Sequence, residues 1–119
     1  GKPRKLLLKA LANEFILATS YGLLKELEEV IARPKFRLSS FEQYKFLNSV
    51  RKTVEVVKVE SDFKVIKEDP DDDKILNAAY DGKVDYIVSG DPDLLRMKQF
   101  KGIKIVTATE MLKILEHLE

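Results

Sequence analysis

The sequence lacks the residues and motifs that mark several large enzyme classes. It contains no cysteine, which excludes disulfides, zinc–thiolate sites and cysteine nucleophiles. Its single histidine, His117, belongs to no HExxH motif and to no Ser–His or Cys–His arrangement. No GxGxxG or GxxxxGK(S/T) segment occurs, so the sequence offers no nucleotide-phosphate cradle. No apolar run approaches the length of about 18 residues that a transmembrane helix requires.

Net charge is almost absent as well. The 119 residues carry 21 Lys and Arg against 20 Asp and Glu, which leaves a formal net charge of +1. This balance excludes a uniformly polybasic binder or an acidic tail, so any electrostatic function depends on uneven placement of charge. A hydrophobic fraction of 45% and a charged fraction of 34% are typical of a soluble globular protein. We expect one domain over residues 1–119, in a cytoplasmic setting that the absence of cysteine permits.

Short apolar runs alternate with amphipathic segments along the chain. Apolar periodicity and capping residues predict helices at residues 3–13, 21–33, 41–52, 70–82, 92–97 and 108–115. Apolar runs predict strands at residues 15–18, 54–57, 85–88 and 103–106, with a connecting loop at 58–68. This order favours an α/β fold with helices on both sides of an open, mostly parallel sheet of about four strands. No strand precedes the first helix, so either the first strand lies outside this sequence or that helix packs on a sheet edge.

Acidic residues gather in two loops. The first loop carries DPDDD at residues 69–73, and the second carries DPD at residues 91–93, directly after a predicted strand. Open α/β sheets bind ligands at the carboxyl ends of their strands, and Mg²⁺ or Mn²⁺ relieves the repulsion between neighbouring carboxylates. The same residues also make a favourable helix start, with Asp at the N-cap and proline in the first turn. The sequence alone leaves capping and metal binding open for each loop.

Other charged residues also permit two interpretations. Glu26 and Glu28 lie at opposite edges of the apolar stripe of the helix at 21–33. Two interpretations follow: one of the two side chains points toward a site, or both side chains are exposed to solvent. Basic residues cluster in two further regions: Lys2, Arg4, Lys5 and Lys9, then Lys98, Lys101 and Lys104. Such clusters hold nucleic-acid phosphates in some proteins and are solvated helix faces in others.

Four segments, in this order, resemble the PIN-domain family. FILATSYGLLKEL at residues 15–27 is similar to the family's second strand and following helix, and ARPKF at 32–36 is similar to a segment common in one branch. DPDDDKIL at residues 69–76 resembles the DPDDDKFL signature of that branch. VDYIVSGDPDLL at 84–95 resembles ADYIVTGDxDLL, with Ser89 where threonine is usual. The branch comprises toxin components of VapC-type toxin–antitoxin systems.

The resemblance implies a three-layer α/β/α PIN-like fold and a metal-dependent endoribonuclease that hydrolyses RNA phosphodiester bonds. By position, Glu26 matches the second acid of the family, Asp73 the third and Asp91 the fourth, and Asp72 is a one-residue alternative to Asp73. These three residues are the implied catalytic residues, and together with Asp93 they are the implied ligands of Mg²⁺ or Mn²⁺. The implied partners are RNA, a cognate antitoxin protein and a second copy of the chain, with no membrane.

One element of the family pattern has no counterpart here. Family members begin with a strand that occupies the sheet centre and ends in an Asp, the first metal ligand. Nothing in this sequence matches it, so the resemblance implies an N-terminally shortened PIN-like domain with the central first strand missing and its activity impaired. The alternative is a non-catalytic PIN-like module that binds protein or RNA and uses its acids as helix caps. A receiver-like domain fits less well, because its acid cluster follows the first strand.

Overall fold

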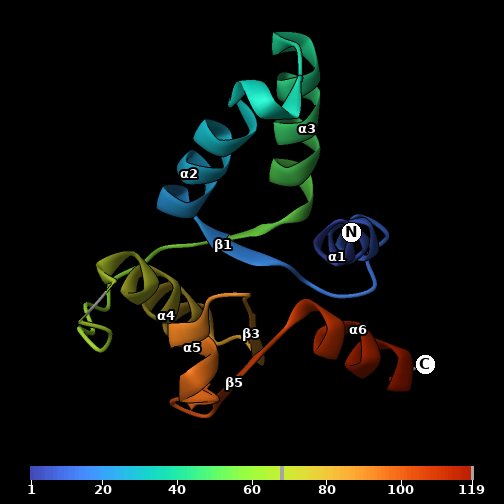
Figure 1. The fold of residues 1–119 in the computed structure, drawn as a ribbon. Helices are drawn as coiled ribbons and strands as arrows, with labels where there is room; N and C mark the ends of the chain where they lie inside the picture. The colour runs from blue at the N-terminus through green and yellow to red at the C-terminus, as the bar shows by residue number, and fades with distance from the viewer. Residues whose placement is uncertain (68, 119) are drawn as a thin grey trace.

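The computed structural model describes residues 1–67 and 69–118 as an arrangement of short strands and covering helices (Figure 1). The helices are α1 (Lys2–Leu11), α2 (Tyr21–Ile31), α3 (Ser40–Thr53), α4 (Pro70–Gly82), α5 (Pro92–Met97) and α6 (Ala108–His117), with a 3-10 turn η1 (Pro34–Phe36). The strands are β1 (Ala18–Ser20), β2 (Glu55–Val57), β3 (Tyr86–Val88), β4 (Gln99–Phe100) and β5 (Ile103–Val106). The predicted α/β class is confirmed. None of the helices in the described ranges is both long enough and apolar enough to cross a bilayer.

Side-chain capping hydrogen bonds confirm the predicted starts of five helices, whereas α1 begins at Lys2 without a side-chain cap. The Ser20 hydroxyl accepts from the Leu23 N–H (3.2 Å) at the start of α2. Capping boxes, in which an N-cap hydroxyl and the third helical residue exchange hydrogen bonds, begin α3 and α6. The first strand forms at Ala18–Ser20 instead of residues 15–18. The described part of the predicted loop, residues 58–67, contains no helix or strand, and residue 68 lies outside the described residues.

The sheet that contains β5 is covered on both faces. Alternate residues of a strand point to opposite faces, and the residues of β5 divide between two core clusters. One cluster consists of Ile66, Leu76, Ala79, Ile87, Leu94, Phe100, Ile103 and Ile105. The other consists of Leu6, Val106, Met111 and Leu115. Helices α4 and α5 therefore cover one face, while α1 and α6 cover the other.

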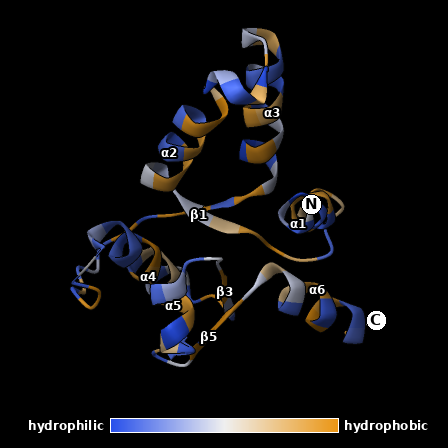
Figure 2. Cartoon of the chain, viewed as in Figure 1, coloured by the Kyte–Doolittle hydropathy of each residue, from blue (hydrophilic) through white to orange (hydrophobic). Residues whose placement is uncertain are grey.

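Helices α2 and α3 form a hairpin that stands away from the two sheets (Figure 1). The two helices contact each other, and α2 also contacts β1. Figure 2 shows hydrophobic segments along both helices, and their buried residues are Leu24, Ile31, Leu47 and Val50. The apolar stripes of α2 and α3, which pack on each other, and the contact of α2 with β1 therefore hold the hairpin in place.

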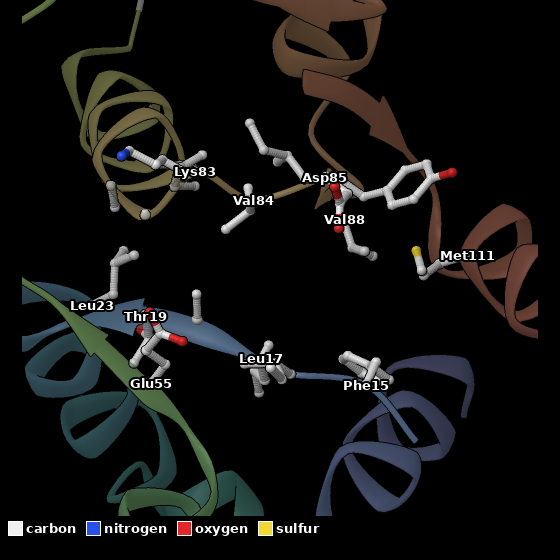
Figure 3. Close-up of a pocket in the computed structure, with 18 residues that line it drawn as sticks. Phe15, Leu17, Thr19, Leu23, Glu55, Lys83, Val84, Asp85, Val88 and Met111 are labelled. Carbon is white, nitrogen blue, oxygen red and sulfur yellow. The ribbon is translucent and has the colours of Figure 1, made fainter. Parts of the chain in front are cut away.

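The strands fall into two sheets instead of the single sheet that the sequence predicts. β1 pairs in parallel with β2, and β3 pairs in parallel with β5, whose other edge takes the antiparallel β4. β4 was not predicted, because two residues are too few to give a periodic signal. A cleft of about 640 Å³ is lined by β1 and β3. Figure 3 shows Leu17 and Thr19 on one side of this cleft, with Val84 and Val88 on the other.

Both strands present a free edge to this cleft. The Glu55 N–H donates to the Leu17 carbonyl (2.8 Å), and in this parallel register the backbone groups of Ala18 point away from β2. On the other side, the Ser89 N–H donates to a β5 carbonyl (3.0 Å), so the backbone groups of Val88 point away from β5. Each sheet therefore borders the cleft with an edge that has no partner strand there among the described residues.

Candidate functional site

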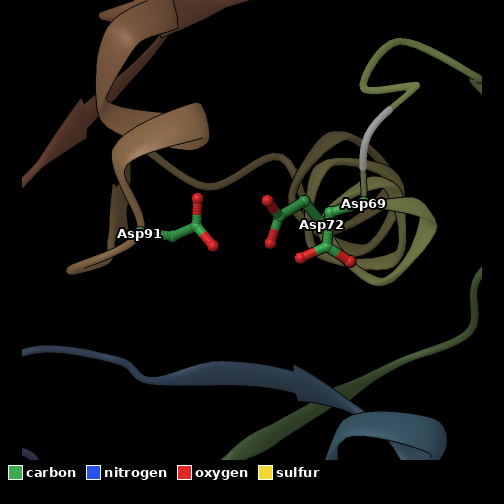
Figure 4. Close-up of side chains that lie close together, drawn as sticks. All are labelled: Asp69, Asp72 and Asp91. Carbon is green, nitrogen blue, oxygen red and sulfur yellow. The ribbon is translucent and has the colours of Figure 1, made fainter.

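Three carboxylates from two helix starts come together in the structure. Asp69 and Asp72 belong to the start of α4, and Asp91 stands at the start of α5, directly after β3. One carboxylate oxygen of each lies within 4.8 Å of one oxygen of each of the others. Figure 4 shows the Asp91 side chain directed from α5 toward the two side chains of α4. We call these three residues the acid cluster.

Two members of the acid cluster are also helix caps. Asp69 Oδ1 accepts from the Asp71 N–H (3.0 Å), and Asp91 Oδ1 accepts from the N–H groups of Asp93 (2.8 Å) and Leu94 (3.4 Å). These bonds satisfy backbone donors that a helix start leaves free. Each cap engages one oxygen of a carboxylate that has two. Capping and cation binding are therefore compatible at these residues.

Asp72 is the buried member of the acid cluster. The residue is only 5% exposed, and its Oδ2 atom has no hydrogen-bond partner among the described residues. Burial, reinforced by the negative charges of Asp91 and Asp69, raises the pKa of Asp72 from 3.8 to about 6. An unpartnered buried oxygen is costly. A divalent cation among these carboxylates would give that oxygen a partner and offset the repulsion, so the residues present fit such an ion.

The predicted ligand Asp91 lies in the acid cluster, whereas Asp73 is engaged elsewhere. Asp73 Oδ1 accepts from the N–H groups of Val65 (3.0 Å) and Ile66 (2.9 Å), so this carboxylate anchors the loop before α4. The position in the cluster belongs to Asp72, the one-residue alternative. Helical spacing explains the difference, because Asp72 precedes the fully buried Leu76 by four residues and shares its stripe.

The other two predicted ligands lie in ion pairs. Glu26 Oε1 is 3.5 Å from the ammonium of Lys74, whose Nζ also lies 3.2 Å from Asp71 Oδ1. This contact joins α2 to the start of α4. Asp93 Oδ1 lies 3.2 Å from the Arg96 guanidinium on the same helix, and its charge is close enough to contribute to the raised pKa of Asp72.

Asp69 is not among the predicted ligands, because the resemblance matches the third acid to Asp73, with Asp72 as the alternative. A sequence signal for it exists, since Asp69 precedes Asp72 by three residues and the two therefore lie on one side of the helix start. That Asp91 meets them follows from tertiary structure. α4 and α5 pack on the same face of the β5 sheet through the core cluster that holds Leu76 and Leu94, and this packing brings their amino-terminal ends together.

Comparison with known proteins gives one match. A family model described as PIN domain matches residues 1–93 of the chain. The matched region includes the whole acid cluster as well as Glu26, Asp73 and Asp93, and it ends before β4 and β5 begin. No curated protein and no solved structure matches the chain.

Proposed function

This chain belongs to the PIN-domain family, and we propose that it is a metal-dependent endoribonuclease that hydrolyses phosphodiester bonds of RNA. PIN domains are generally nucleases that act on nucleic acid, and they usually bind Mg²⁺ or Mn²⁺. The observation that carries the proposal is the buried Oδ2 of Asp72, which has no hydrogen-bond partner in residues 1–67 and 69–118 and lies inside a cluster of three carboxylates.

We assign the cation to the acid cluster. Asp72 and Asp91 are its primary ligands and Asp69 is the third, while Asp73 keeps its role in anchoring the preceding loop. When bound, the cation supplies charge neutralisation for the phosphate and activation of water. The protein's own residues position the site: the ion pair of Glu26 with Lys74 joins α2 to the start of α4, and the capping hydrogen bonds hold the carboxylates of Asp69 and Asp91.

The resemblance of the four segments supports a more specific proposal. We propose that the chain is the toxin component of a toxin–antitoxin system, that a cognate antitoxin binds it, and that it forms a homodimer. Sedimentation of the purified chain tests the dimer directly, since a monomeric mass at tens of micromolar would contradict it.

We also propose that one extended strand fills the cleft between β1 and β3 and joins the two sheets. Both edges direct backbone N–H and C=O groups into a cleft with largely apolar walls. An edge of this kind can pair with an added strand. Amide hydrogen exchange at Ala18 and Val88 tests this in a chain extended by the residues encoded before Gly1. Slow exchange in the extended chain alone is expected, and equal exchange in both chains would contradict the proposal.

A set of neighbouring Asp→Asn substitutions tests the nuclease itself. Asp72→Asn and Asp91→Asn should abolish RNA cleavage in Mn²⁺ and the thermal stabilisation that Mn²⁺ gives to the wild type. Asp71→Asn is the matched control, because Asp71 lies on the same helical turn but is exposed and paired with Lys74. Asp73→Asn should keep Mn²⁺ stabilisation, since its carboxylate anchors the loop.

The same measurements decide the alternative, a non-catalytic module whose acids serve only as caps. The observation in its favour is that Asp69 and Asp91 already have capping partners. A module of this kind gives no Mn²⁺ stabilisation in any variant and no cleavage that EDTA suppresses. Cleavage that survives in Asp72→Asn and Asp91→Asn would also refute the assignment of the site.

A further inference from the structure

The connection between α2 and α3 is basic and aromatic, and it stands apart from the acid cluster. We call residues 33–45 the α2–α3 tip. Between Ile31 and Phe41 the chain carries three cations and no acid: Arg33, Lys35 and Arg37. All three are exposed, and none forms an ion pair within the described part of the chain. In Figure 1 this connection lies at the end of the hairpin remote from both sheets.

Three large aromatic side chains are exposed on the same tip. Phe36 is 45% exposed, Phe41 67% and Tyr44 63%. Phe41 and Tyr44 are three residues apart on α3, so they lie on one side of that helix. Scattered apolar residues are ordinary on a surface, but three aromatic rings within nine residues, beside unpaired cations, form a concentrated patch.

The cations and the rings of the tip are interleaved. Lys35 Nζ lies 5.2 Å from the centre of the Phe36 ring, and Lys45 Nζ lies 5.4 Å from that of Phe41. The acid of the tip, Glu42, is already occupied, because its Oε1 accepts from the Ser39 N–H (2.9 Å) in the capping box of α3. The patch therefore presents positive charge next to flat apolar faces.

We propose that the α2–α3 tip binds single-stranded RNA, a proposal that rests on the proposed function. Cations neutralise phosphates, and exposed aromatic rings stack with bases that are not already stacked in a duplex. Single-stranded RNA offers both phosphates and unstacked bases. The tip is connected to the start of α4 through α2: Glu26 precedes the end of α2 at Ile31 by five helical residues, about 7 Å along the axis, and it contacts the start of α4 through Lys74.

Binding without cleavage provides the test. Fluorescence anisotropy measures the affinity of the full chain for a labelled 12-nucleotide single-stranded RNA in EDTA, over a series of salt concentrations. Replacing Arg33 and Lys35 by Gln and Arg37 by Asn removes three charges, and Asn suits the left-handed backbone at position 37 (φ 52°). The matched control replaces Lys2, Arg4 and Lys5 of α1 by Gln, which removes the same charge from another exposed surface.

We expect the tip variant to bind at least tenfold more weakly and its slope of log K against log salt to become shallower by about 2, as expected for three lost contacts to a single strand. The α1 variant should bind within about twofold of the wild type. The double variant Phe41→Ala and Tyr44→Ala should lose at least about thirtyfold in affinity with an unchanged salt slope, because stacking releases no counterions. Thermal unfolding of each variant verifies that it is folded.

Two outcomes would overturn the proposal. One is an equal loss of RNA affinity in the tip and α1 variants, and the other is an unchanged RNA affinity in the tip variant, including the case in which that variant loses binding to a protein instead. The nuclease proposal fails independently. If cleavage does not depend on Asp72 while the tip variant still loses RNA affinity, the nuclease site is refuted and RNA binding by the tip is supported. If cleavage depends on Asp72 but the tip variant binds RNA normally, RNA binding by the tip is refuted and the nuclease site is supported.

Discussion

Replacing Asp72 by Asn should stabilise the chain in the absence of metal. The carboxyl of Asp72 has a pKa of about 6 in the folded chain, against an ordinary value of 3.8. Ionising it in the folded state therefore costs about 3 kcal/mol more than in the unfolded state. The groups that oppose its ionisation are Asp69, Asp91 and Asp93, together with burial. An Asn of similar shape removes the charge and offers an amide that donates to those carboxylates.

The sign of the pH dependence follows from which state holds the proton more tightly. Between about pH 4 and 6 the folded chain keeps a proton on Asp72 that the unfolded chain has lost, so the free energy of unfolding falls as pH rises through this window. Below pH 4 both states are protonated, and wild type and variant should have similar stability. Above pH 6 the variant should be more stable by up to about 3 kcal/mol, or by about 10 °C in Tm.

Urea unfolding followed by circular dichroism in EDTA, from pH 4 to 8, measures the difference between wild type and Asp72→Asn. The difference reports Asp72 together with its coupling to Asp69, Asp91 and Asp93, because carboxylates that are not coupled to it titrate alike in both proteins. Asp71→Asn, an exposed neighbour, should follow the wild type closely. Mn²⁺ at 1,000 times Kd should reverse the order, since it stabilises the wild type by about 4.1 kcal/mol and leaves the variant unchanged. A variant that is less stable than the wild type at pH 8 in EDTA would refute the reasoning.

The remaining predictions concern the packing around the site. Leu94→Ala should cost about 2–5 kcal/mol in denaturant unfolding, because the side chain is fully buried; a loss below 1 kcal/mol would contradict its place in the core. Asn77→Ala should cost about 2 kcal/mol and speed exchange of the Phe63 amide, which donates to Asn77 Oδ1 (2.7 Å), whereas unchanged exchange would show that the bond is not needed. Hydrogen bonds from Ser61 lower the pKa of Asp81, so its stabilisation holds above about pH 4 and is lost as pH falls below that value. The stability gap between wild type and Asp81→Ala should therefore shrink on acidification, and a gap that widens would contradict this.

Much of the local structure could be predicted from single residues. Ser20, Ser39 and Thr107 begin their helices as the capping rules require, because a cap depends on atoms within three residues of one another. Sheet pairing could not be read in the same way. The run at residues 15–18 is apolar enough for a strand, but β1 forms at Ala18–Ser20, where the chain meets β2, and contacts between distant residues decide that register.

The sequence by itself determined that this chain alternates helices and strands, that acids concentrate at two helix starts, and that its segments resemble one family of nucleases. These properties depend on residue type and short spacing, which the order of residues states directly. Tertiary structure alone decided which carboxylates meet. The rotation of α4, set by burial of Leu76, turns Asp72 inward and leaves Asp73 to anchor the loop. The packing of α4 and α5 on one sheet face then brings Asp91 within 4.8 Å of Asp72, a proximity between residues 19 positions apart that no local pattern encodes.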